Sequence, residues 1–172
     1  MIPRPQPDEY PPYYGDYMAR VPEGADVLGF LSTQLDALLH TLARIPDHEA
    51  ASGWQPGKWT LKQEVGHLAD VERILGYRAL CLARGEQQPL PGFEQDDYAR
   101  ESRANDRTLA DLAREFELLR RANLLQFAHL APEVAARRGT ASGMPVSVRA
   151  ILYALAGHTQ RHLEKIREHY VK

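Results

Sequence analysis

The C-terminal part of the chain contains the stretch LYALAGHTQRHLEKI, which spans residues 152–166. Apolar residues recur in it at intervals of three and four, the spacing of a helix with one buried side. His158 and His162 stand four residues apart on that side, about 6 Å apart along a helix axis. Because Leu155 and Ile166 share the same face, the two imidazoles are expected to point into the protein, where they need polar partners. A divalent metal ion would satisfy both.

The composition places limits on the class of protein. The chain has 172 residues, of which 44% are hydrophobic and 26% charged, as in a single globular domain. Its formal charge of -2, without a dense Lys/Arg cluster on any predicted face, argues against a nucleic-acid partner. No apolar run approaches the roughly 18 residues of a membrane helix, and the N-terminus lacks a signal-peptide core, so we expect a cytoplasmic protein without a membrane partner. The lone Cys81 excludes an intrachain disulfide.

Two parts are expected along the chain. Residues 1–22 hold six of the twelve prolines and four of the eight tyrosines, a composition that disfavours regular structure. They are expected to form an irregular but ordered or semi-ordered arm, rich in aromatic residues, that can lie over the core. Residues 23–172 are expected to form one helical domain. Apolar periodicity predicts long helices over residues 23–44, 60–84, 108–129 and from 147 almost to the C-terminus. Thr60, Thr108 and Ser147 are the predicted N-caps of the last three, and Thr60 with Gln63 has the form of a capping box.

Two links between these helices are expected to be irregular. Residues 85–106 make a connection longer than most in compact domains, which favours a functional role. Its residues Phe93, Asp96, Asp97 and Tyr98 are expected either to shape a pocket or simply to cap the bundle. Residues 131–145 form the second link, and no strand-like alternation of comparable strength is visible in the chain. The sequence therefore predicts an all-α four-helix bundle, a fold whose sites are built from side chains of facing helices.

A third histidine completes a candidate metal site. His67 lies on the predicted helix 60–84, and the apolar Val71 and Ile74 follow it on the same face. Three protein ligands with an open position are typical of catalytic sites, and imidazole nitrogen suits zinc, nickel and iron. Gly66 and Gly157 directly precede two of the three histidines. Close helix packing and room beside a metal explain these glycines equally well.

The same residues restrict the chemistry. Zinc proteases of the His-Glu-x-x-His type need glutamate after the first histidine, and Thr159 stands there instead. Glu64 and His67 give one Glu-x-x-His, whereas di-iron bundles use two, so one metal is favoured over two. No catalytic side chain is identified. A metal-bound water or thiolate is the expected nucleophile, and Glu64, Asp70 and Tyr77 are the candidate bases or outer partners.

Three segments carry a resemblance to a known family. Residues 59–70 (WTLKQEVGHLAD), 89–98 (PLPGFEQDDY) and 157–162 (GHTQRH) resemble the signatures of the DinB/YfiT-like superfamily, and the similarity runs from about residue 54 to residue 170. The resemblance implies a bundle of up-down-down-up topology that holds one metal ion, commonly nickel or zinc. The ligands it implies are His67, His158 and His162. It also implies a homodimer and a small-molecule substrate, with thiol-dependent transferases and isomerases using low-molecular-weight thiols, and metal-dependent hydrolases, among its relatives.

Two classes of function stay open on the sequence. The first is a metal-dependent enzyme, a hydrolase or S-transferase, with open coordination positions on the three histidines. The second is a non-catalytic metal-binding or stress-associated module in which the ion stabilises the bundle. A fourth protein ligand would favour the second, since structural metal sites are usually closed. A bundle without metal, whose core histidines are satisfied by the protein, is the remaining alternative.

Overall fold

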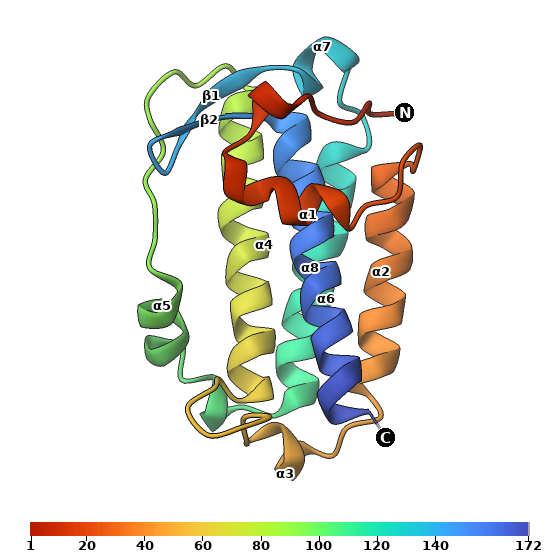
Figure 1. Ribbon diagram of the computed structural model, residues 1–172, viewed down its shortest axis with the longest axis vertical. Helices are drawn as coiled ribbons and strands as arrows, with labels where there is room; N and C mark the ends of the chain where they lie inside the picture. The colour runs from red at the N-terminus through yellow and green to blue at the C-terminus, as the bar shows by residue number, and fades with distance from the viewer. Residues whose placement is uncertain (172) are drawn as a thin grey trace.

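Four long helices form the body of the molecule. The computed structural model describes residues 1–171, and its long helices are α2 (Val27–Leu42), α4 (Leu61–Ala83), α6 (Leu109–Phe127) and α8 (Val148–Tyr170). Figure 1 shows α4 and α6 running in one direction and α2 and α8 in the other. Neighbouring pairs are α4 with α6 and α8, and α2 with α6 and α8. The predicted four-helix bundle of up-down-down-up topology is confirmed.

Side-chain caps fix where the long helices begin. The Thr60, Thr108 and Ser147 side chains each accept a hydrogen bond from the backbone N–H three residues on, as predicted. Thr60 and Gln63 form the expected capping box. The first long helix was predicted to begin at Glu23, but it begins at Val27 because Asp26 caps it. Each cap satisfies an amide that would otherwise lack a partner at the helix end.

The link between α4 and α6 joins two parallel helices and therefore runs along the whole bundle. Figure 1 shows it descending beside α4. The prediction of an irregular link was only partly correct, because the link contains the short helix α5 (Gln95–Glu101) and the 3-10 turn η3 (Ala104–Asp106). One further short helix, α3 (Asp47–Ala50), lies between α2 and α4.

The link between α6 and α8 contains strands that the sequence analysis missed. After the short helix α7 (Pro132–Ala135), β1 (Arg138–Ala141) pairs antiparallel with β2 (Met144–Ser147). Ser142 and Gly143 join them in a two-residue turn with φ of 52° and 74°, the left-handed pair that a tight hairpin requires. Pro145 and Gly139 obscure any apolar alternation in strands of only four residues. The hairpin also binds the α4–α6 link, since Leu90 pairs by backbone hydrogen bonds with Thr140 and Ser142.

The N-terminal arm is ordered and lies across the bundle. It contains two 3-10 turns, η1 (Pro7–Glu9) and η2 (Pro12–Tyr14), and the short helix α1 (Gly15–Ala19), which Figure 1 shows crossing α8. The expectation of irregular structure is thus corrected in part. Ion pairing anchors the arm, because the almost fully buried Glu9 accepts from Arg149 of α8 at 2.7 Å. Arg4 closes the arm on itself by donating to the Val21 carbonyl at 2.8 Å.

A glycine on α8 makes room for this arm. A Cβ added to Gly157 would lie 2.0 Å from the backbone oxygen of Tyr17, a distance no real contact adopts. A Cβ on Gly66 would lie 3.3 Å from Ala104 of the α4–α6 link. Both glycines therefore serve close packing, and Gly157 serves the contact with α1 rather than space beside a metal.

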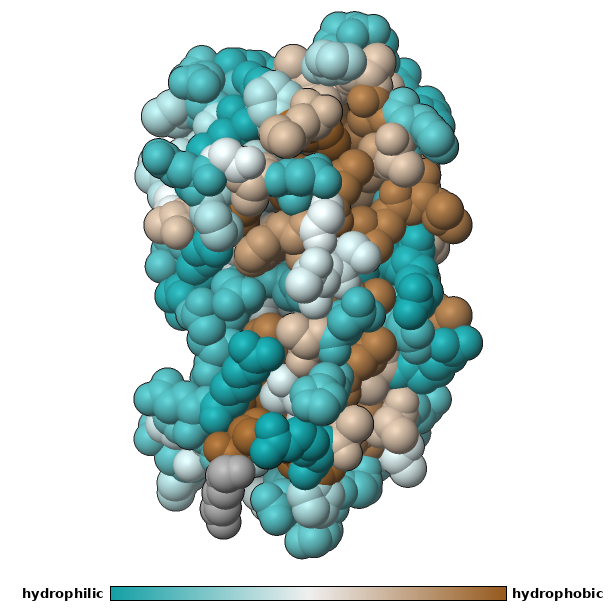
Figure 2. All heavy atoms as spheres, turned by 90° about the vertical axis from the view of Figure 1, so that its right-hand side faces the viewer, coloured by the Kyte–Doolittle hydropathy of each residue, from teal (hydrophilic) through white to brown (hydrophobic). Residues whose placement is uncertain are grey.

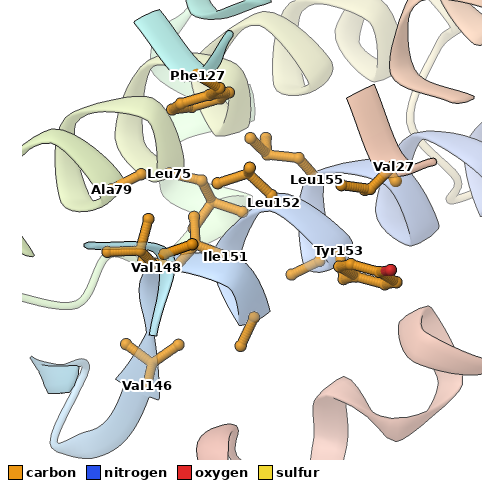
Figure 3. Packing of buried hydrophobic residues seen from close by; sticks show 14 of the residues in the cluster. Val27, Leu75, Ala79, Phe127, Val146, Val148, Ile151, Leu152, Tyr153 and Leu155 are labelled. Carbon is orange, nitrogen blue, oxygen red and sulfur yellow. The ribbon is translucent and has the colours of Figure 1, made fainter. Parts of the chain in front are cut away.

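The apolar core is divided into an upper and a lower cluster. The upper one joins the arm and hairpin to the bundle, and Figure 3 shows its centre, where Leu75 of α4, Phe127 of α6 and Leu152 of α8 converge. The lower one is built around Leu38, Leu68 and Phe116. Burying these side chains from opposite helices is the main stabilising contribution to the bundle.

A layer of buried polar side chains separates the two clusters. Arg120 of α6, which has no exposed surface, donates to Glu72 of α4 at 2.8 and 3.1 Å. The same guanidinium donates to Gln34 of α2 at 3.2 Å and to Thr159 of α8 at 2.9 Å. Gln34 in turn donates to the Ala156 carbonyl at 2.9 Å. One side chain of α6 thus contacts the other three long helices at a single level of the bundle.

The outer surface is mixed in character. Figure 2 shows the side of the bundle over α2, where hydrophobic residues gather in the upper part beside polar ones. Leu118 and Leu125 are large apolar residues exposed on α6. Over residues 1–171, no helix has both the length and the apolar character needed to cross a membrane.

Substituting the close-packed glycine tests the placement of the arm. We expect Gly157→Ala to lower the free energy of unfolding by about 1–3 kcal/mol, because the new methyl must displace the Tyr17 backbone. Proteolysis between the arm and α2 should accelerate as well. Gly15→Ala is the matched control in the arm, since a Cβ there meets nothing within 4 Å. Chemical denaturation measures the free energy of unfolding of both variants. Equal stability of Gly157→Ala and Gly15→Ala would contradict the placement of the arm.

The polar layer makes a second prediction. Arg120→Met should destabilise the protein by about 3–5 kcal/mol, because it leaves the Glu72 carboxylate buried without its cation. Adding Glu72→Met should restore much of the loss, since two apolar side chains of similar volume then fill the layer. Urea unfolding of the single and double variants measures the coupling. A double variant less stable than Arg120→Met would show that the ion pair is not the source of the cost.

Candidate metal centre

Three histidines from two helices meet beneath the N-terminal arm. The Nε2 atom of His158 lies 3.1 Å from that of His67 and 3.2 Å from that of His162. His67 comes from α4 and the other two from α8, one helical turn apart. One ring nitrogen from each lies within 4.8 Å of the others, so the structure brings together the three histidines that the sequence analysis selected.

A buried carboxylate orients one of the three rings. Glu64, which has no exposed surface, lies 2.7 Å from Nδ1 of His162. Lys165 donates to the other oxygen of the carboxylate at 3.2 Å. Burial acts to raise the pKa of Glu64, but the His162 hydrogen bond and the Lys165 charge bring it below its ordinary value. The carboxylate is therefore ionised and accepts a hydrogen bond from Nδ1 of His162, which directs Nε2 of that ring toward the other two histidines.

The other two rings are held by aromatic neighbours. Trp59 packs on His67 with ring centroids 5.0 Å apart, and Tyr17 packs edge-on against His158 at 5.4 Å. The Nδ1 atoms of both histidines are buried without a hydrogen-bond partner among residues 1–171. Position and orientation of these rings come from packing, whereas His162 is fixed by a hydrogen bond.

The electrostatics favour neutral imidazoles at His67 and His158. Burial, followed by the neighbouring His162, lowers the pKa of His67 to about 3. The same causes lower the pKa of His158 well below its ordinary value. Neutral imidazole is the form that binds a metal. The Nε2 atoms of the three rings face one another. A divalent cation fits such a site, because imidazole nitrogens are its common ligands.

Two cavities adjoin the histidines. The larger one, of about 600 Å³, has mainly aromatic and apolar walls. Its lining includes Tyr13, Tyr14 and Tyr17 of the arm, Phe93 of the α4–α6 link and one face of α4 with His67, Val71, Leu75 and Arg78. The polar residues Glu94, Gln95 and Ser142 also line it. His158 also lines it. The histidines thus face a chamber of the size that small-molecule sites have.

The second cavity, of about 540 Å³, lies on the other side of the three rings and is polar. Lys58, Arg161 and Lys165 supply positive charge to its wall, beside Trp54 and Trp59. His67, His158 and Tyr17 border both cavities. The histidine cluster therefore stands between an apolar chamber and a basic one.

The candidate bases differ in position. Glu64 belongs to the site, as its contact with His162 shows. Asp70 does not line either cavity and pairs with Arg73 at 3.9 Å. Tyr77 is 58% exposed and borders a surface depression that shares Arg78 and Phe93 with the larger cavity but contains none of the three histidines. Of the three, only Glu64 is placed to act on the histidines.

The α4–α6 link contributes to the site through part of the predicted set. Phe93 lines the apolar chamber and Asp96 the basic one. Asp97 and Tyr98 instead border a pocket on another side of α4. His169 stacks on Trp54 with centroids 4.4 Å apart and does not belong to the histidine cluster.

The sequence analysis gave the arm no part in the site and did not select Arg78. Tyr14 and Tyr17 lie in the segment that was set aside as irregular, although their clustering with Tyr13 was a visible signal. Arg78 follows His67 by eleven residues, which is three helical turns, and this spacing places both on one face of α4.

Comparisons with known proteins agree with this picture. The model of the DinB superfamily matches residues 31–166. One similar solved structure is YfiT from Bacillus subtilis, which is described as a probable metal-dependent hydrolase with an unusual four-helix bundle topology. The two structures superpose with a TM-score of 0.77 at 15% sequence identity, over 93% of this chain and 91% of the YfiT chain. The search of curated proteins gave no match. The arm residues 1–22 lie outside the range of the family model.

Metal binding is the first test of this centre. We expect the full chain to bind one divalent ion, and His158→Ala to abolish binding, because that ring is central to the cluster. Glu64→Gln should weaken affinity by about 10–100-fold through the loss of the His162 orientation. Competition with a chromophoric chelator measures both, with His40→Ala as the control on an exposed histidine of α2. Undiminished binding by His158→Ala would refute the ligand assignment.

Proposed function

Since the chain belongs to the DinB superfamily, we propose that it is a metal-dependent enzyme whose ion is held by His67, His158 and His162. The observation that carries the proposal is the convergence of three Nε2 atoms at the border of two cavities. Imidazole ligands of this kind suit zinc and nickel. A bound ion supplies Lewis acidity and lowers the pKa of a water or thiol toward neutrality.

The arrangement favours catalysis over a purely structural ion. A structural site is normally closed by four protein ligands. Among residues 1–171, the cluster that can hold an ion contains the three histidines and no other His, Cys, Asp or Glu. Glu64 is engaged with His162 and Lys165. Coordination positions therefore remain for small molecules that enter from the cavities.

The protein side chains have distinct roles in this proposal. Glu64 orients the ring of His162 by accepting a hydrogen bond from its Nδ1 atom. Tyr17 and Trp59 hold His158 and His67 and exclude water from their buried edges. The basic chamber, with Lys58 and Arg161, attracts anionic groups toward the histidines.

The reaction class follows from the chemistry of an open three-histidine site. Hydrolysis and transfer of a low-molecular-weight thiol both use a nucleophile activated by the ion. The description of YfiT as a probable metal-dependent hydrolase favours the first. We propose hydrolysis as the primary activity and thiol transfer as the second candidate, with zinc or nickel as the cofactor.

Activity assays on loaded and stripped protein test the proposal. Ester hydrolysis is followed with 4-nitrophenyl acetate, and thiol transfer with cysteine and monochlorobimane. We expect turnover with zinc or nickel that disappears on chelation and in His158→Ala, because the ion would activate the water or thiol that acts as the nucleophile. His40→Ala should retain full activity. Turnover that is independent of metal, or equal in His158→Ala, would reject the mechanism.

A further inference from the structure

Arg78 is a buried cation without an anion. The residue is 4% exposed, and among residues 1–171 it forms no ion pair with a carboxylate. Its Nη2 donates to the Pro91 carbonyl at 2.6 Å and to Ser142 Oγ at 2.9 Å, both uncharged. Buried charges in proteins are almost always paired, because an isolated one is costly. Arg120, the other buried arginine near the site, has Glu72 as its partner.

The unpaired cation borders the apolar chamber. Arg78 lines that cavity together with His67 and His158. Glu94 also lines it, but this exposed residue does not lie within ion-pair distance of Arg78. Only Nη2 has acceptors among the described residues, so the other guanidinium N–H groups remain available to a molecule in the chamber.

The chamber has two chemically different ends. His67, Val71, Leu75 and Arg78 follow one another on one face of α4 and all line it. Arg78 follows His67 by eleven residues, so their Cα atoms are about 16 Å apart along the helix axis. Between them the wall is apolar, and Tyr14 lies close enough to Arg78 to feel its charge, although burial raises the pKa of its phenol and keeps it neutral.

We infer that Arg78 binds the carboxylate of an elongated substrate whose apolar or aromatic body lies against Val71, Leu75 and the arm tyrosines. The guanidinium geometry suits a carboxylate, and the low-polarity walls strengthen the contact. The opposite end of such a molecule reaches the histidines. This inference deepens the proposed function, on which it rests only in taking the histidine end as the reacting end. It makes the arm and Arg78 determinants of specificity.

The test compares two ligands of nearly the same shape, one with a charged carboxylate and the other with a neutral amide. Binding of 4-phenylbutanoate and 4-phenylbutanamide to the full chain is measured by calorimetry, on both chelator-stripped and zinc-loaded protein. We expect the carboxylate to bind about tenfold more tightly or better in both states, because a hydrogen-bonded buried charge is worth that much. Arg78→Gln should reduce the preference to within about twofold. Arg84→Gln, at the exposed end of the same helix, should leave it unchanged.

A second variant covers the case in which Arg78→Gln fails to fold. Ser142→Asp places a carboxylate beside the guanidinium, at a left-handed position that aspartate tolerates. It should remove the carboxylate preference while the arginine stays in place. A wild type without preference, or a preference that survives Ser142→Asp or Arg78→Gln, would overturn the inference. The stripped protein keeps this test separate from the metal proposal, because a protein that binds no metal can still show the preference.

Discussion

The ionic layer around Arg120 is the constraint on which the rest of the structure depends. One guanidinium reaches Glu72, Gln34 and Thr159, and so touches a partner on each of the other three long helices. The apolar clusters above and below are non-directional in their energetics, whereas the hydrogen bonds of a buried arginine are directional, and a shift of one helix along another would leave its charge unsatisfied. Thr159 directly follows His158 in the chain, and Glu72 lies just over one turn beyond His67. The layer therefore sets the height at which the histidines of α4 and α8 meet.

The sequence predicted those features whose signal is local and periodic. The long helices follow from apolar spacing, and three of their starts follow from a threonine or serine that caps them. His67, His158 and His162 could be selected together because each lies on the apolar face of such a helix, where an imidazole is unusual. The resemblance to the DinB/YfiT-like family added the topology, which periodicity alone does not determine. These are the levels at which local preference and tertiary packing agree.

What the sequence could not predict depends on contacts between distant segments. The hairpin formed by β1 and β2 has short strands interrupted by Gly139 and Pro145, and it is held by pairing with Leu90 as much as by its own pattern. The arm is held across α8 because Glu9 pairs with Arg149 and because Gly157 leaves room for the Tyr17 backbone. From the sequence, Gly157 could serve either close packing or room beside a metal, and the contact with α1 shows that it serves packing. The spacing of Arg78 from His67 was not enough to select it, since an arginine on a helix is ordinarily at the surface.

The order of the helices requires a long connection between α4 and α6. Two parallel neighbours cannot be joined by a tight turn, so the chain must travel back along a helix of 23 residues, about 34 Å, before the next one begins. In this molecule it travels over the face where Phe93 and Asp96 border the two cavities. A bundle of simple up-down-up-down order would leave that face bare. Here the covering strip can change in length and composition while the four helices and their histidines stay fixed, so new substrates can be accommodated without refolding the scaffold.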